Sequence, residues 1–360
     1  MSAAETPHRP EGAAAAWSGP AAAARAAAER GAAALGVDFP LVQAGMGGVA
    51  GPELAAAVAD SGALGTVALY KSDSDQSAAL VADTAARTRR GFGVNVIPEV
   101  AGRLLADQIG ALLVTADRPL VLNSYGMLPE REAVRVLAAG HRLLIQVGSA
   151  AEAADAAALG AHAIALQGVE AGGHHLGKLT TRQLLGRCGA APAPPLLVAG
   201  AVAGGADLFD AMLLGACGAV CGTPFVATAE SSAHPDYKAA LVRAEGGDTV
   251  VTDRFSIGWP GRPHRVLRGA VTDAPQPLPA TLIAWTSVMG ARRPVPRGSA
   301  AAPTAEAEGQ VEQMAQYAGL GCGALRAVRP AAAVVAAFRD EFAAACGSPS
   351  PDAVATGAPR

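Results

Sequence analysis

The segment at residues 167–175, QGVEAGGHH, is the densest group of residues in this chain that could do chemistry. A histidine on a glycine-rich loop can act as a general base, can donate a hydrogen bond to a developing negative charge, or can be an ordinary surface residue. The two glycines before it permit a tight turn with exposed backbone N–H groups. We predict that His174, rather than His175, is catalytic. The sequence leaves open whether Glu170 orients a histidine or caps a loop.

Side-chain amides end or interrupt several apolar runs. Asn95 lies within FGVNVIP, Gln146 within LLIQV and Gln167 at the end of AIALQ, and NSYG at residues 123–126 follows another run. A buried amide must be hydrogen-bonded. It can therefore satisfy nearby backbone, or it can bind a heterocycle that presents both donors and acceptors, as a flavin ring does. The sequence leaves both roles open for these amides.

The elements that position these residues are eight short apolar runs. Ala-rich stretches that are typical of helices separate one run from the next. Continuous apolarity is typical of strands covered on both faces, so the alternation predicts parallel βαβ units. Open sheets rarely reach eight such units, and no GxGxxG follows the first run. We therefore predict an α/β fold, a parallel (β/α)8 TIM barrel with a smaller additional lobe. The runs are Pro40–Ala44, Leu64–Leu69, Phe92–Ile97, Leu120–Ser124, Leu143–Val147, Ala163–Gln167, Leu196–Gly200 and Ala219–Gly222.

Glycines follow several of these runs. The segment QAGMGG at residues 43–48 would let backbone approach a flat ligand closely, although an ordinary turn has the same composition. Phosphate sites in such barrels lie after strands seven and eight, where backbone N–H groups point at the anion. Gly200, Gly222 and Thr223 suit that role. These features predict a phosphate-bearing cofactor with a planar ring, and FMN fits best.

The regular pattern covers only part of the chain. It fails after about residue 245, where TDRFSIGWPGRPHRVLR and a Pro-rich segment follow. Ala/Pro/Gly-rich ends predict disorder. The predicted division is a disordered and helical extension at 1–35, an FMN-binding barrel at 36–245, a small lobe covering the substrate at 246–308, C-terminal helices returning to the barrel at 309–346, and a disordered tail at 347–360.

Bulk composition argues against several classes of protein. Net charge is −3 over 360 residues, which gives no reason to expect nucleic acid as a partner. The start lacks the pattern of a secretory signal, and no apolar stretch is long enough to cross a membrane. The five cysteines form no CxxC pair and suggest reduced thiols rather than a metal site. We expect a cytoplasmic protein that binds neither a metal nor a membrane.

Several segments together resemble the nitronate monooxygenase family, formerly called 2-nitropropane dioxygenases, and its relative enoyl-acyl carrier protein reductase II. They include FGVNVIP, ALQGVEAGGHH, GTPFVATAESSAHPDYKAAL and GQVEQMAQYAGLGCG, and the resemblance covers about residues 38–345. It implies an FMN barrel with a small second domain and places the catalytic histidine on His174. To the FMN contacts that it implies we add Gln146. The full predicted set is Gly45, Met46, Gly47, Asn95, Gln146, Gln167, Gly172, Gly173, Gly200, Gly222 and Thr223.

This sequence departs from the family pattern near the predicted flavin. Gly45 stands where the family commonly has Pro, Ala201-Val202 follow Gly200 where the family has Gly-Ile, and Val220 replaces a common Gln. FMN binding should survive, because most donors there are backbone groups. The substrate is less certain to be the family's, and adaptation to a specialised pathway is one alternative.

The resemblance implies FMN-dependent oxidation of an alkyl nitronate by O2 to a carbonyl compound and nitrite. The alternative is an NAD(P)H-dependent flavin reductase of the enoyl reductase II or quinone reductase type. A non-catalytic FMN-binding subunit and a flavin-free phosphosugar isomerase or aldolase are further alternatives. The expected partners are a small-molecule substrate and O2, while use of NAD(P)H and formation of a homodimer stay open.

Overall fold

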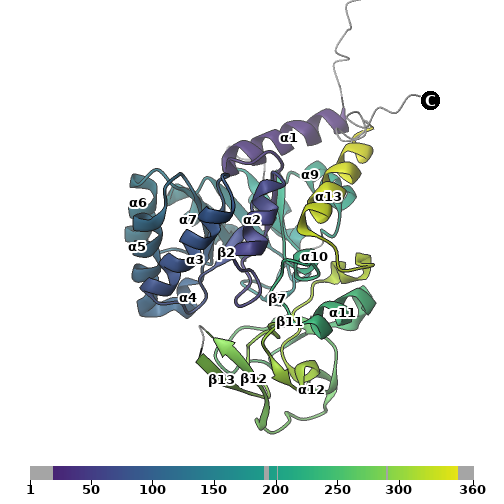
Figure 1. The fold of residues 1–360 in the computed structure, drawn as a ribbon. Helices are drawn as coiled ribbons and strands as arrows, with labels where there is room; N and C mark the ends of the chain where they lie inside the picture. The colour runs from purple at the N-terminus through teal and green to yellow at the C-terminus, as the bar shows by residue number, and fades with distance from the viewer. Residues whose placement is uncertain (1–18, 190–193, 201, 289–290, 348–360) are drawn as a thin grey trace, which may run out of the picture.

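Eight parallel strands form the centre of the molecule (Figure 1). The computed structural model describes residues 19–189, 194–200, 202–288 and 291–347. Neighbouring strands pair in the order β1-β9-β8-β6-β5-β4-β3-β2, each buried along nearly its whole length. The strands are β1 (Leu41–Gln43), β2 (Thr66–Ala68), β3 (Gly93–Val96), β4 (Val121–Tyr125), β5 (Arg142–Val147), β6 (Ala163–Gln167), β8 (Leu196–Ala199) and β9 (Gly218–Cys221).

The first and last strands of this order meet and close the sheet. Val42 forms a parallel bridge with Leu64, just before β2, and the Gln43 N–H donates to the Leu64 carbonyl at 2.9 Å. The Gln43 side chain continues the seam by accepting from the Thr66 N–H at 2.8 Å. The predicted (β/α)8 barrel is therefore confirmed, and each of the eight predicted runs overlaps one of its strands, although β4, β5 and β9 each extend one residue beyond the run.

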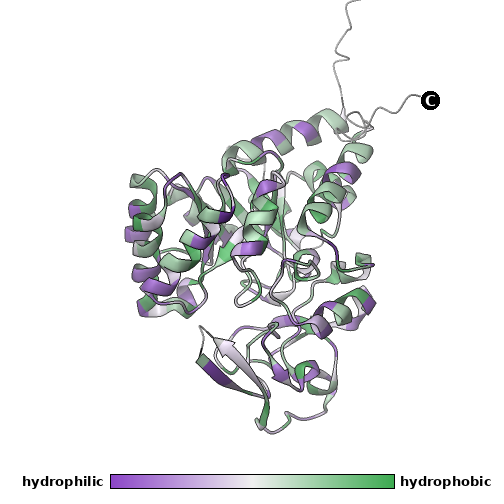
Figure 2. Ribbon diagram, viewed as in Figure 1, coloured by the Kyte–Doolittle hydropathy of each residue, from purple (hydrophilic) through white to green (hydrophobic). Residues whose placement is uncertain are grey.

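Helices cover the outside of the barrel and turn apolar faces toward the strands (Figure 2). Local signals set their ends: Pro52 opens α2 at its first position, and Asp73 and Thr180 cap α3 and α8 through their side chains. The longer barrel helices are α2 (Pro52–Asp60), α3 (Ser74–Arg87), α5 (Leu105–Thr115), α6 (Glu130–Ala138), α7 (Ala150–Ala158), α8 (Thr181–Cys188) and α9 (Gly205–Leu213).

Small apolar side chains fill the end of the barrel next to helix α1 (Pro20–Leu35). Val42, Leu144, Ala163 and Leu197 from four strands pack there with Leu35, which ends this helix. Helix α1 lies at the end of the barrel opposite the second lobe (Figure 1). The low aromatic content of the chain fits this core, because Val, Leu and Ala suffice to fill a narrow barrel.

The second lobe lies beyond the carboxyl ends of the strands (Figure 1). One antiparallel sheet has the order β10-β11-β7 and the other β13-β12-β14. In the first, β7 is the predicted active-site loop itself, because Gly173 and His174 pair with Arg265 and His264. The strands are β7 (Gly173–His174), β10 (Thr249–Thr252), β11 (His264–Leu267), β12 (Leu282–Val288), β13 (Ala291–Pro296) and β14 (Glu308–Gly309).

Shorter helices lie in the barrel loops, at the passage to the lobe and within the lobe. Helix α4 (Pro98–Ala101) and 3₁₀ helix η1 (Gly102–Leu104) follow β3, helix α10 (Thr223–Val226) follows β9, and α11 (Pro235–Arg243) leads into the lobe through 3₁₀ helix η2 (Gly246–Asp248). Within the lobe, α12 (Ala270–Asp273) follows β11.

The C-terminal segment returns to the barrel through one long helix, α13 (Ala331–Ala345), which packs against α9 and α2. A helical pattern was predicted from residue 309, but the stretch before Ala331 holds only two 3₁₀ helices, Val311–Gln313 and Leu320–Ala324. Glycines at GLGCG and Pro330 favour this irregular backbone. Of the extension predicted at 1–35 and the disordered tail predicted at 347–360, residues 1–18 and 348–360 lie outside the described residues.

Candidate active site

One cavity lies at the carboxyl ends of the barrel strands and holds about 1300 Å³ of space, including its open mouth. His174 and every predicted cofactor residue line it, although they come from seven different strand ends and loops. Parallel strands place their carboxyl ends at one face of a barrel, and this geometry brings the residues together. The predicted residues that line the cavity are Gly45, Met46, Gly47, Asn95, Gln146, Gln167, Gly172, Gly173, His174, Gly200, Gly222 and Thr223.

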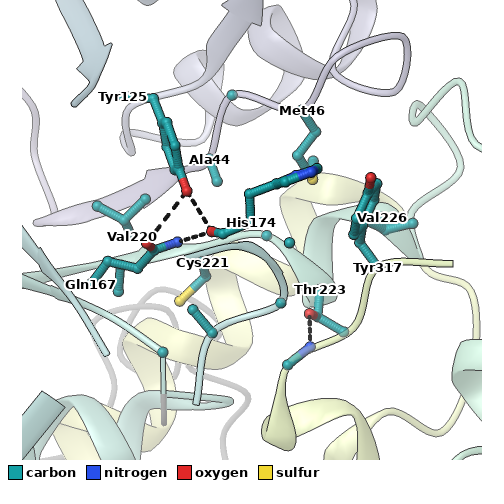
Figure 3. Close-up of a pocket in the computed structure, with 18 of the residues that line it drawn as sticks. Ala44, Met46, Tyr125, Gln167, His174, Val220, Cys221, Thr223, Val226 and Tyr317 are labelled. Atoms are coloured by element: carbon teal, nitrogen blue, oxygen red, sulfur yellow. Dashed lines mark hydrogen bonds between the residues drawn. The ribbon is translucent and has the colours of Figure 1, made fainter. Parts of the chain in front are cut away.

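The backbone of His174 is anchored to two barrel strands (Figure 3). Its carbonyl accepts hydrogen bonds from the Tyr125 hydroxyl of β4 and from Gln167 Nε2 of β6, the latter at 2.9 Å. Gln167 Oε1 accepts from the Leu176 N–H at 2.8 Å, so one amide holds both sides of the histidine turn. Gln167 therefore positions the loop as well as lining the cavity.

The imidazole ring of His174 is packed between aromatic rings. The Trp259 indole stacks on it with ring centroids 3.9 Å apart and an angle of 15°, and His264 and Tyr317 contact it at 4.8 Å and 5.5 Å. Burial lowers the pKa of His174 to about 3, and His264, His175 and Arg262 add to the shift. The ring is therefore neutral at neutral pH, and its buried Nε2 has no hydrogen-bond partner within the described chain.

The other two histidines near His174 have structural partners. His175 Nε2 lies 2.9 Å from the Ala171 carbonyl. His264 Nδ1 lies 3.1 Å from the Arg262 carbonyl, and its Nε2 accepts from the Phe255 N–H at 3.2 Å. Burial lowers the pKa of both rings. Hydrogen bonds to backbone fix His175 and His264, while the ring of His174 retains a nitrogen for a ligand.

Four amide side chains line the cavity, one from each of the neighbouring strands β3 to β6: Asn95, Asn123, Gln146 and Gln167. Asn95 Nδ2 donates to the Asn123 carbonyl at 2.9 Å, which fixes the orientation of the amide. Asn95 Oδ1 is buried and has no partner in the described structure. A buried acceptor without a donor is costly, so this atom suits a ligand N–H.

Glycines at three lining positions allow close approaches that a Cβ would prevent. A Cβ on Gly45 would lie 2.2 Å from Asn95 Cγ, and one on Gly172 would lie 2.7 Å from the backbone at Ala318. Gly200 has a φ of +104°, and its Cβ would lie 2.7 Å from the Ala171 nitrogen. These glycines keep loop backbone close to the cavity wall.

The part of the cavity after β8 and β9 is formed by backbone and a hydroxyl. Gly200, Gly222 and Thr223 meet the segment around Gly319 and Gly321 there. Thr223 Oγ1 accepts from the Gly319 N–H at 3.0 Å (Figure 3), which leaves its own proton available for a ligand. No Lys or Arg side chain lines the cavity among the described residues, so an anion there would be held by N–H and O–H donors.

The cavity contains one carboxylate, Glu170, among its described lining residues. Its oxygens accept from the Thr181 N–H at 3.0 and 3.2 Å, at the first turn of α8. A carboxylate is stabilised at a helix N-terminus. Glu170 therefore fastens the loop to α8, and the structure places no histidine bond on it.

Sequence reasoning missed the aromatic side chains of the site. Tyr70, Tyr125, Tyr237, Trp259 and Tyr317 line the cavity, and the last two come from outside the barrel. Tyr125 belongs to the segment NSYG at the end of an apolar run, and this place in the sequence indicated that it could lie at the catalytic face. For Trp259 the only available signal was an aromatic residue within the turn IGWPG, because no periodicity connects that turn to the barrel.

Within the described residues, no group of three or more His, Cys, Asp or Glu could hold a metal ion, and all five cysteines are free thiols. Among the described helices, none is both long and apolar enough to cross a membrane.

Comparisons with known proteins show the family of the chain. A sequence profile of the nitronate monooxygenase family matches residues 29–341. The nitronate monooxygenase of Paraburkholderia phytofirmans is 29% identical, with 86% of this chain and 93% of that protein covered. FabK from Thermotoga maritima superposes with a TM-score of 0.71 at 26% identity, with 87% and 95% covered.

A further relative is the (3aS,4S,5R,7aS)-5-hydroxy-7a-methyl-1-oxo-octahydro-1H-indene-4-carboxyl-CoA dehydrogenase of Mycobacterium tuberculosis. It is 34% identical over 65% of this chain, and the match spans 64% of that protein's length. The family profile covers most of the chain, including every described residue that lines the cavity. The chain belongs to the nitronate monooxygenase family and is an oxidoreductase.

Proposed function

We propose that the chain binds FMN and oxidises an alkyl nitronate with O2 to a carbonyl compound and nitrite. The observation that carries the proposal is a single cavity in which a neutral, unpartnered His174 meets every residue predicted to hold the flavin. Two nitronate anions and one O2 balance two carbonyl compounds and two nitrite ions.

The residues that line the cavity suit both the ring and the phosphate of FMN. Asn95 Oδ1 offers an unused acceptor to a ring N–H. Gly200, Gly222 and the Thr223 hydroxyl would hold the phosphate, and the close approaches at Gly45 and Gly172 would keep backbone near a flat ring. When bound, FMN supplies redox chemistry that side chains lack, accepting electrons from the nitronate and returning them to O2.

The protonation state of His174 favours a nitronate over a neutral nitroalkane. A nitroalkane must lose a proton from carbon, and a base with a pKa of about 3 is poorly matched to that task near neutral pH. A nitronate has already lost that proton. In this proposal His174 donates a hydrogen bond from its unpartnered Nε2 to the anionic oxygens and does not act as the base.

Nitrite release tests the proposal directly. Purified protein with FMN bound, mixed with propyl-2-nitronate in air, should release nitrite. His174→Asn should retain FMN and lower kcat/KM by about 10²- to 10³-fold, the effect of removing one preorganised donor. His162→Asn is the control, because His162 precedes β6 at the opposite end of the barrel and should leave turnover unchanged. Absence of nitrite with FMN bound would refute the proposed nitronate activity. Full activity of His174→Asn would refute the proposed role of His174.

The second candidate is an NAD(P)H-dependent flavin reductase. It is favoured by the likeness to FabK and by the 34% identity to a protein named as a CoA-ester dehydrogenase. The same cavity would serve, with His174 beside the flavin. Anaerobic addition of NADH or NADPH discriminates the two, since only a reductase loses its flavin colour rapidly under these conditions.

A further inference from the structure

Trp259 belongs to the second lobe, yet its side chain forms part of the barrel's cavity. It packs with Ile97 of the barrel and Ala300 of the lobe, and it is 8% exposed. Besides stacking on His174, its ring meets the Tyr125 ring edge-on at 5.7 Å. This indole is therefore the part of the lobe in closest association with the predicted catalytic ring.

The indole nitrogen of Trp259 is buried and has no partner in the described chain. An indole N–H can only donate, so its partner must be an acceptor. Neither nearby tyrosine hydroxyl accepts from it: Tyr125 donates to the His174 carbonyl, Tyr317 donates to the Ala300 carbonyl at 2.8 Å, and the indole nitrogen has no hydrogen bond to either hydroxyl. Two stacked rings, His174 and Trp259, thus both carry an unpartnered nitrogen beside one cavity.

The backbone that carries Trp259 is held in place. Gly258 has a φ of +93°, a conformation that favours glycine, and its carbonyl accepts from Lys71 Nζ at 3.2 Å. The Trp259 N–H donates to the Ser256 carbonyl at 3.2 Å, and Arg262 pairs with Glu99 of α4 at 2.9 Å. The indole is therefore positioned before any ligand arrives, as a binding group must be.

The polar groups of the cavity favour recognition of an anion by N–H donors. Glu170 is its one described carboxylate and is already bonded to Thr181, and Arg262 beside the Trp259 turn is paired with Glu99. With no cation among the described lining residues, an anion in this cavity would be held by N–H and O–H donors.

We propose that Trp259 is a substrate-binding residue whose indole N–H donates a hydrogen bond to an oxygen of a planar oxyanion, on the side of the cavity where His174 lies. The identity of that oxyanion as a nitronate rests on the proposed function. The placement of an anion-binding indole rests on the geometry described above.

Trp259→Phe tests the proposal because it keeps an aromatic ring against His174 and removes the N–H. The measurements are the Kd of the FMN-loaded protein for nitrite, by titration, and the KM for propyl-2-nitronate. We expect both to rise about tenfold, the size expected for a hydrogen bond to a charged group, with kcat changed less than about threefold. Trp285→Phe is the matched control, since Trp285 lies in β12 against Arg292 and lines no part of the cavity.

Two measurements keep the result interpretable. FMN content and Tm report whether Trp259→Phe folds. If it does not, benzothienylalanine at position 259, which replaces the N–H by sulfur at nearly constant shape, takes its place. Equal nitrite binding by wild type and variant, including no binding by either, would overturn the proposal. Loss of nitrite binding in the variant, without nitronate turnover by any form, would sustain the role of Trp259 and refute the proposed function.

Discussion

At the scale of the residue, the protein keeps an imidazole neutral by burying it among aromatic rings. His174 is 6% exposed and carries the Trp259 indole on one face. Desolvation disfavours the charged form, and neighbouring histidines and Arg262 disfavour it further. The neutral ring carries one N–H, which can donate a hydrogen bond to an anion.

This arrangement predicts acid sensitivity. The unfolded chain protonates His174 near its ordinary pKa of about 6.5, whereas the folded protein does so only near 3, so no effect is expected above pH 6.5. Below it, the unfolded state binds the extra proton and the free energy of unfolding falls by up to about 1.4 kcal/mol per pH unit. Urea titrations between pH 7 and 4.5 should show a shallower acid loss for His174→Asn than for wild type. Parallel curves for the two proteins would contradict the neutral state assigned to His174.

Many of the residues around the cavity could be predicted from sequence, because strand ends in a barrel share one face. His174 and the glycines follow apolar runs, and the amides lie within these runs or end them. Trp259 and Tyr317 could not be placed, since they reach the cavity through a lobe whose pairings join segments distant in sequence. The pKa of His174 could not be predicted from the sequence either, because it depends on burial by these same rings.

At the scale of the element, a two-residue strand joins the two parts of the molecule. Strand β7 carries His174 and pairs with β11, so the lobe fixes the predicted catalytic loop as an edge strand. Arg265 of β11 supports this pairing by donating to the Val169 carbonyl at 2.8 and 3.0 Å and to Thr249 Oγ1 at 3.0 Å. The sequence predicted a loop here, because two residues are too few to show strand periodicity.

Loss of the Arg265 side chain should loosen the His174 loop. Arg265→Met leaves the Val169 carbonyl without these donors, and we expect about 2 kcal/mol lower stability and at least a tenfold lower kcat/KM. Arg268→Met is the control, because its ion pair with Asp273 is half-exposed at 3.5 Å and should contribute less than about 1 kcal/mol. Urea unfolding and nitronate kinetics check both variants. Similar behaviour of the two would show that the β7 support is dispensable.

At the scale of the whole molecule, barrel and lobe enclose one cavity that a cofactor should stabilise. A ligand that binds only the folded state raises stability by about 2.7 kcal/mol at a concentration of 100 Kd. FMN added to flavin-depleted protein should therefore raise its Tm by several degrees. A Tm independent of FMN concentration would contradict the assigned cofactor.

Two glycine substitutions distinguish the FMN-dependent rise in Tm from changes in stability that do not involve FMN. Gly200→Ala adds a Cβ 2.7 Å from the Ala171 nitrogen at a φ of +104°, so it should lower both Tm and the FMN-dependent rise in Tm. Gly186→Ala, in α8 with no atom near its new Cβ, should raise stability by about 0.5–1 kcal/mol and leave the FMN response unchanged. Thermal melts with and without FMN check the pair. An unaltered FMN response in Gly200→Ala would argue against phosphate binding at that loop.

The barrel itself could be predicted from eight apolar runs, because continuous apolarity is what strands buried on both faces require. Its closure depends on the contact between Val42 and Leu64, which no local pattern reveals. The fold of the lobe could not be predicted from the sequence either, since its strands are short and β7 pairs with β11, which lies far along the chain.

The visible spectrum of the purified protein under anaerobic conditions tests the central claim most directly, because it reports the cofactor and its reductant together. We predict flavin absorbance bands that bleach on addition of propyl-2-nitronate and persist after addition of NADH or NADPH, with slower bleaching by nitronate in His174→Asn. A colourless protein, or a flavin that only NADH or NADPH can bleach, would contradict the account.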